Sequence, residues 1–123
     1  MPTPISEAEA QVMEVLWAAT GPLSTEDVVA ALEGRQEWQL ATIKTLLNRL
    51  LNKGALSAEK DGRRYLYTPV LKREDWVGDQ ASGLLDRLFG GSLAPLVAQF
   101  SSQRKLTAEE LAALKKLLKD NEQ

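Results

Sequence analysis

Residues 42–69 have the sequence TIKTLLNRLLNKGALSAEKDGRRYLYTP, and the spacing of their apolar side chains changes once along this stretch. From Ile43 to Leu51 apolar residues recur three or four positions apart, which predicts a helix with one buried face. Gly54 suits the left-handed position just after a helix, and from Leu56 apolar and polar residues alternate. The sequence therefore predicts a helix followed directly by a β-hairpin.

The dipeptide Asp61-Gly62 favours a two-residue hairpin turn, so the sequence predicts the turn there. The predicted cross-strand partners are Leu56 with Tyr67, Ala58 with Tyr65, and Glu59 with Arg64. The apolar side of such a hairpin can cover the helices, which leaves its basic residues near an exposed tip.

Two shorter helices are predicted before this segment. Ser6 with Glu9, and Ser24 with Asp27, have the spacing of helix-capping residues, and Gly34 suits the end of the second helix. Three helices and then a two-stranded wing are the order of a winged helix-turn-helix, whose third helix enters the DNA major groove. The predicted fold is mainly α with a small β-hairpin, with residues 1–72 as a winged helix-turn-helix DNA-binding domain.

The apolar pattern of residues 73–123 predicts a helical dimerisation domain. Helical patterns run up to Gly90, from Ser92 onward, and after Thr107. Three short helices offer one another too little surface to bury their apolar faces, so packing against a second copy of the chain is the simplest way to bury them. The alternative is that these helices fold back on the winged domain. The predicted dimer interface consists of Leu84, Leu85, Leu88, Phe89, Leu93, Leu96, Val97, Phe100, Leu111, Leu114, Leu117 and Leu118.

Charge is distributed unevenly along the 123-residue chain, whose formal net charge is −2. Residues 1–38 carry seven acidic side chains and one basic one, whereas residues 39–72 carry seven basic and two acidic ones. DNA responds to the local field and not to the net charge of the whole chain, so the positive middle segment is the candidate DNA-binding surface.

The predicted DNA contacts lie on the polar side of the third helix and on the wing. They are Gln39, Ala41, Thr42, Lys44, Thr45, Asn48, Arg49, Lys53, Lys60, Arg63 and Arg64. An ordinary solvated helix face and charge that protects a strand edge are the competing interpretations. The aromatic residues Trp17, Trp38, Tyr65 and Tyr67 suit core packing better than a platform for single-stranded nucleic acid.

Composition argues against an enzyme and against cofactor or metal binding. The chain has no cysteine and no histidine, the residues that most often supply thiolate and imidazole chemistry. Carboxylates such as Glu9, Asp27, Glu109 and Glu110 lie in first turns of predicted helices, where they act as caps. The chain also has no apolar run long enough to span a membrane, which predicts a cytoplasmic protein.

Three stretches resemble the penicillinase-repressor (BlaI/MecI) family of transcriptional regulators. They are Ile5-Ser6-Glu7-Ala8-Glu9 with Val12-Met13 and Leu16-Trp17, Thr42 to Leu50 with Lys53-Gly54-Ala55-Leu56, and Arg63 to Val70. The resemblance covers nearly the whole chain. It implies a homodimeric repressor of resistance or stress genes that binds an inverted repeat with TACA- and TGTA-type half-sites.

The resemblance also implies release from DNA by cleavage, through a membrane sensor protease pathway, at a bond that matches Gln99-Phe100. The family has Asn before that Phe, and it often begins the recognition helix with Ser-Pro-Lys where this chain has Gln39-Leu40-Ala41. The copper-responsive branch has paired cysteines that this chain lacks, which excludes copper sensing. The second hypothesis is a protein-interaction scaffold that binds no specific DNA, in which the acidic first third and the leucine-rich tail would dock a partner. The sequence pI of about 5.2 favours it slightly.

Overall fold

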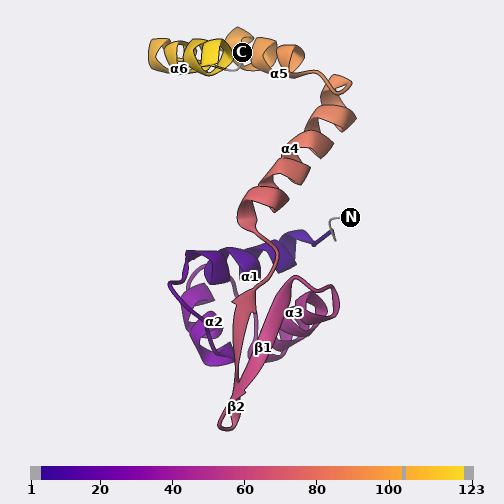
Figure 1. The fold of residues 1–123 in the computed structure, drawn as a ribbon, viewed down its shortest axis with the longest axis vertical. Coiled ribbons are helices and arrows are strands. Elements are labelled where there is room, and N and C mark those ends of the chain that lie inside the picture. The colour runs from indigo at the N-terminus through magenta and orange to yellow at the C-terminus, as the bar shows by residue number, and fades with distance from the viewer. Residues whose placement is uncertain (1–3, 104, 121–123) are drawn as a thin grey trace. The chain divides into compact units, whose positions relative to one another are not determined.

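A computed structural model describes residues 4–103 and 105–120 of the chain, which forms two compact units, residues 1–79 and 80–123. The first unit contains α1 (Glu7–Ala18), α2 (Thr25–Leu32), α3 (Leu40–Asn52), β1 (Leu56–Asp61), β2 (Arg64–Pro69) and the start of α4 (Arg73–Phe89). In Figure 1 the hairpin runs between α2 and α3 to a tip that extends past both helices. The winged helix-turn-helix predicted from the sequence is confirmed.

The first two helices begin at the predicted caps. The Ser6 hydroxyl accepts a hydrogen bond from the Glu9 N–H at 3.1 Å, while the Glu9 carboxylate accepts one from the Ser6 N–H at 2.7 Å. Ser24 and Asp27 form the same reciprocal pair at the start of α2. These bonds satisfy N–H groups that the first turn of a helix leaves without partners. Gly34, with φ of 83°, follows α2 as predicted.

The predicted register of the hairpin is wrong by two residues. The strands pair Ala58 with Tyr67 and Asp61 with Arg64, so the two-residue turn is Gly62-Arg63. Gly62 has φ of 65° and is the first central turn residue, where the hairpin turns that match strand twist need a positive φ. Leu23 and Tyr67 also exchange two backbone hydrogen bonds, which tie this strand to the loop before α2.

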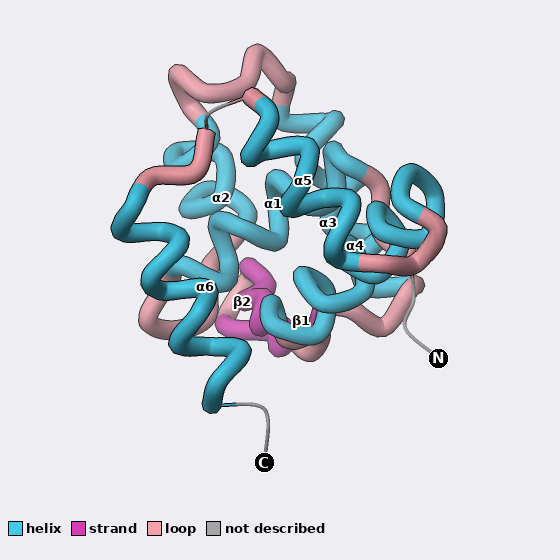
Figure 2. The backbone as a smooth tube through the Cα atoms, turned by 90° about the horizontal axis from the view of Figure 1, so that it is seen from above, coloured by secondary structure: helices cyan, strands magenta, loops and turns pink. Residues whose placement is uncertain are grey.

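In the observed register Gly62 takes the first central turn position, and Tyr67 pairs with both Ala58 and Leu23. The dipeptide rule considers the turn alone and does not include these pairings. Side chains alternate with a period of two, so a shift by two residues keeps every side chain on its predicted face. The two strands form one ribbon, drawn in magenta in Figure 2.

The core of the first unit lies where the three helices meet the base of the hairpin. Its buried members are Val12, Met13, Val15, Leu16, Val28, Leu32, Ile43, Leu46, Leu47, Leu50, Ala55, Leu56 and Tyr67. Trp17 and Trp38 are half-buried and pack against this core, as predicted. Tyr65 contradicts the prediction of core packing, because it lies nearer the tip of the hairpin and is 51% exposed.

The start of α4 is bound to α1. The Trp17 indole N–H donates to the Leu71 carbonyl at 2.8 Å, and the Trp17 and Trp76 rings lie 5.5 Å apart. The Arg73 guanidinium also pairs with the Glu14 carboxylate at 2.7 Å. The boundary between the compact units accordingly falls after residue 79, inside α4.

The second unit contains the rest of α4, α5 (Leu93–Ser102) and α6 (Ala108–Asp120). Among the described residues of these three helices, none is buried. A mainly apolar groove lies between α5 and α6, lined by Leu93, Leu96, Val97, Phe100, Leu106, Glu110, Ala113, Leu114 and Leu117. Within residues 4–103 and 105–120, no helix is both long and apolar enough to cross a membrane.

Candidate nucleic-acid interface

The polar side of α3 is solvent-exposed along its whole length. Its apolar side is held in the core by Ile43, Leu46, Leu47 and Leu50. The predicted contact residues on the other side are all exposed: Gln39, Ala41, Thr42, Lys44, Thr45, Asn48 and Arg49. The sequence folds this way because the apolar residues cover one face of the helix, which leaves the short polar groups on the other.

Two side chains near the start of α3 differ in their freedom to hydrogen-bond. Gln39 is the N-cap residue, but its side chain makes no capping hydrogen bond. The Thr45 hydroxyl donates to the Ala41 carbonyl at 3.0 Å, so its remaining capacity in this conformation is as an acceptor. An acceptor is suited to the amino groups that adenine and cytosine present in the major groove.

Lys53, the C-cap of α3, is part of an internal ion pair. Its Nζ lies 2.5 Å from Oε1 of Glu9, whose side chain is only 1% exposed. Burial raises the pKa of Glu9, but hydrogen bonds from Lys53 and Ser6 outweigh burial and hold that pKa below its ordinary value of 4.5. The predicted contact of Lys53 with a phosphate remains a prediction, and its ammonium group already has this partner.

The cationic residues of the hairpin lie at its exposed end. Lys60, Arg63 and Arg64 are all exposed, as the sequence predicts. The Arg64 guanidinium lies 3.3 Å from the Asp61 carboxylate across the turn, and both side chains are more than half exposed. Surface pairs of this kind are weak, so Arg64 can exchange Asp61 for another anion at little cost.

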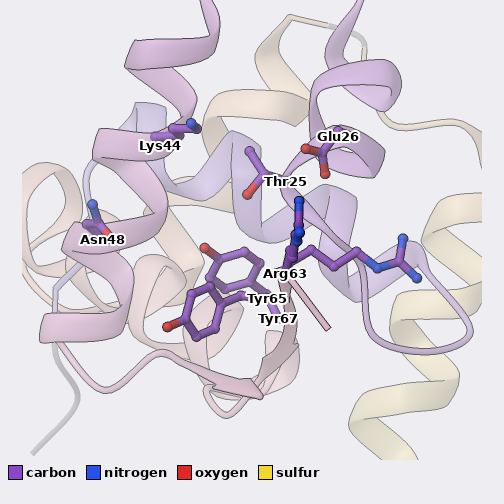
Figure 3. A pocket seen from close by; sticks show the side chains of 8 residues that line it. Thr25, Glu26, Lys44, Asn48, Arg63, Tyr65 and Tyr67 are labelled. Carbon is purple, nitrogen blue, oxygen red and sulfur yellow. The ribbon is translucent and has the colours of Figure 1, made fainter. Parts of the chain in front are cut away.

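A groove of about 250 Å³ lies between α2, α3 and the hairpin. Its lining residues are Thr25, Glu26, Lys44, Asn48, Arg63, Arg64, Tyr65 and Tyr67. Figure 3 shows the two tyrosine rings side by side, with their hydroxyl groups directed toward the helix that carries Lys44 and Asn48. Three cationic side chains and one carboxylate, Glu26, therefore line one groove. The sequence predicted DNA contacts on α3 and on the hairpin separately. The structure brings residues of both elements together in one groove.

The sequence does not predict that Tyr65 lines this groove, nor that Leu40 is exposed. Alternation in phase with Tyr67 predicts that Tyr65 packs in the core, but Tyr65 is 51% exposed. Leu40 is 48% exposed at the first position of α3, although helical spacing puts it on the same side as Ile43 and Leu47. In both cases periodicity gives the correct face but cannot show where the core beneath that face ends.

The predicted dimer residues lie on α4, α5 and α6, and none of the described residues of these helices is buried. Leu88, Leu117 and Leu118 are 66%, 58% and 60% exposed. Phe100, on α5, is 40% exposed and lines the apolar groove with Leu93. Clustered exposed apolar side chains often mark an interaction site.

Comparison with known proteins shows the family of this chain. The family model described as penicillinase repressor matches residues 5–120. The chain belongs to the penicillinase repressor family. A penicillinase repressor of Bacillus licheniformis is 34% identical over 117 residues, which cover 95% of this chain and 91% of that protein. The sequence-based resemblance is thus confirmed, and with it the prediction of a DNA-binding regulator of the repressor class and not an enzyme.

Solved structures of family members match the winged helix-turn-helix. The solution structure of the DNA-binding domain of the repressor BlaI is 40% identical with a TM-score of 0.54, over 59% of this chain and 88% of that chain. The solution structure of monomeric Bacillus licheniformis BlaI in complex with the blaP half-operator is 40% identical with a TM-score of 0.52, over 60% of this chain and 90% of that chain.

Proposed function

We propose that this protein is a homodimeric transcriptional repressor that binds an inverted-repeat operator with TACA- and TGTA-type half-sites, and that it controls resistance or stress genes. The observation that carries the proposal is the exposed polar face of α3 next to the cationic tip of the hairpin. Both lie in the first compact unit of a chain that belongs to the penicillinase repressor family. The half-operator complex of the BlaI relative supports the DNA part of the proposal.

The proposal divides the DNA contacts into two groups. Thr42 and Thr45, near the start of α3, contact base edges, whereas Arg49 and Arg63 contact phosphates. In domain terms, residues 1–72 bind DNA and residues 73–123 form the dimer. The first turn of α4 contacts α1, so the DNA-binding unit extends structurally a few residues beyond that boundary.

Fluorescence anisotropy tests this proposal with the full chain, a labelled duplex that contains the inverted repeat, and excess random-sequence competitor. If the dimer neutralises about 6 to 10 phosphates, affinity falls by roughly 10³ to 10⁵ between 50 and 200 mM salt. Arg49→Ala weakens binding to every duplex alike, whereas Thr42→Ala alters the preference between half-site sequences. Binding that random DNA removes equally well would favour the second hypothesis, a protein-interaction scaffold.

Dimerisation rests on the exposed apolar residues of α4, α5 and α6. A second copy would remove these side chains from water, and each leucine so buried contributes about 1.5–3 kcal/mol. Sedimentation equilibrium of the full chain measures the mass directly, and Leu93→Asp, in the apolar groove, should shift it toward the monomer. A monomeric wild-type chain at micromolar concentration would leave folding back within the chain as the explanation of these leucines.

The last part of the proposal is release by proteolysis at Gln99-Phe100, in a membrane sensor protease pathway. This bond lies inside α5 and is near the end of that helix, and Phe100 is 40% exposed. A protease needs an extended substrate strand, so cleavage requires the last turn of α5 to unwind. Mass spectrometry of the protein from antibiotic-treated cells tests this step, and an intact chain during full derepression would refute it.

A further inference from the structure

The groove between α2, α3 and the hairpin contains a tyrosine that has no place in the core. Tyr65 is 51% exposed, whereas Tyr67, two residues along the same strand face, is 8% exposed. Both line the groove, and Figure 3 shows their hydroxyl groups directed toward the helix of Lys44 and Asn48. Half of a large aromatic side chain is thus left in water beside cationic residues, although deeper burial would be more favourable.

We propose that this groove holds one backbone phosphate of the DNA, and that Tyr65 is a DNA-contacting residue whose hydroxyl donates a hydrogen bond to that phosphate. The inference rests on the proposed function and adds to it a contact residue and a site. Lys44 from α3 and Arg63 from the hairpin line the same groove, so the phosphate lies between two cations that belong to different elements. A phenol hydroxyl is a donor of the type that fixes the register of a protein on the duplex.

The groove also contains an acidic side chain that would repel the phosphate. Glu26, in the first turn of α2, lines it and is exposed. The next residue, Asp27, is held by the cap with Ser24, and hydrogen bonds from the Ser24 backbone and side chain lower the pKa of Asp27. Glu26 is not one of the two residues of this capping box, and its side chain lines the groove beside the proposed phosphate. Its carboxylate therefore weakens binding to any duplex, and its removal strengthens that binding.

The test is a comparison of Tyr65→Phe with wild type in the full chain, by anisotropy on the inverted-repeat duplex. Removing the hydroxyl should weaken binding about tenfold, the size expected for one hydrogen bond to a charged group. The ring is retained, so the fold is preserved. Thr68→Val is the matched control, because Thr68 is an exposed residue of the same strand and is not among the groove residues. The control should bind like wild type.

A second measurement locates the contact on the DNA. Duplexes in which single phosphates are replaced by neutral methylphosphonates are titrated with wild type and with Tyr65→Phe. At one phosphate per half-site the loss seen with wild type should be much smaller for the variant, because their shared interaction is already gone. Equal losses for both proteins at every phosphate would overturn the inference.

Glu26→Gln provides an independent check of the groove. It should raise affinity about threefold, as expected when one like charge is removed near a phosphate. Glu33→Gln is the control for net charge, since Glu33 is exposed at the other end of α2. An equal gain from both variants would overturn the placement of the phosphate in the groove.

Different results would refute the proposed function and the proposed Tyr65 contact. A wild-type chain that does not distinguish the inverted repeat from random DNA refutes the proposed function. A wild-type chain that does so, with Tyr65→Phe binding within about twofold of it, refutes only the contact proposed here.

Discussion

The two compact units have the same kind of apolar spacing and use it differently. In α3, Leu47 and Leu50 are completely buried, whereas Leu88 of α4 and Leu118 of α6 are 66% and 60% exposed. The helices of the first unit cover one another and the hairpin, while those of the second have no buried residue among those described. Apolar periodicity thus identifies a face that needs cover, but not the molecule that supplies it.

The largest effect is expected from a cavity in the first unit. Leu47→Ala should lower the free energy of unfolding by about 3–5 kcal/mol, because the side chain is completely buried against a core that cannot fully collapse. Chemical denaturation followed by tryptophan fluorescence measures this loss. The loss should be independent of protein concentration, since the partners of Leu47 lie within its own unit. A loss that changes with dilution would contradict the view that this unit is self-sufficient.

A somewhat smaller effect is expected at the ion pair between α1 and α3. Lys53→Met leaves the buried Glu9 carboxylate without its cation and should cost about 2–3 kcal/mol of unfolding free energy. The salt dependence of DNA binding should have the same slope as in wild type. A lysine that contacts a phosphate would instead reduce that slope by about one when mutated, and such a result would assign Lys53 to the DNA surface.

Acid should weaken the same unit through Glu9. The pKa of Glu9 is lower in the folded chain than its ordinary value of 4.5, so its stabilising contribution is complete above that value. The contribution is lost as the pH falls from about 5 through the folded-state pKa. Glu9→Gln removes this titration, and its stability should therefore fall less than that of wild type between pH 6 and pH 3. Parallel curves would show that Glu9 does not contribute to acid sensitivity.

In the second unit the expected effect depends on concentration. Leu88→Ala should cost about 1–2 kcal/mol if a second copy covers this leucine, and the thermal midpoint of the variant should fall further on dilution than that of wild type. Melts over a hundredfold range of protein concentration measure this dependence. A variant that melts like wild type at every concentration would remove Leu88 from the interface.

The smallest effect is expected at Arg73, where the first unit continues into α4. Its pair with Glu14 raises the pKa of the guanidinium, but both side chains are about half exposed. Arg73→Gln should therefore shift the thermal midpoint much less than Lys53→Met does, and the shift should vanish at high salt. An effect as large as that of Lys53→Met would show that the ion pair holds α4 more firmly than solvent exposure suggests.

Apolar periodicity and local caps predicted most of the first unit correctly, and the exceptions share one cause. The caps at Ser6 and Ser24 depend on residues three positions apart, so the sequence contains the whole interaction. In the observed hairpin, Tyr67 also pairs with Leu23, which is far from it in the chain, and a rule for the turn alone cannot include that contact. The exposure of Tyr65 likewise depends on how far the helices extend beneath the strand.

The sequence alone determined the element types, the helix ends, the separation of charge and the family resemblance, because each follows from neighbouring residues or from patterns along the chain. Only the tertiary structure joined Glu9 to Lys53 and gathered Lys44, Arg63 and Tyr65 around one groove. These arrangements are decided by contacts between residues that are distant in sequence. Such contacts form only when the buried faces of several helices and the hairpin pack together, and no local rule specifies them.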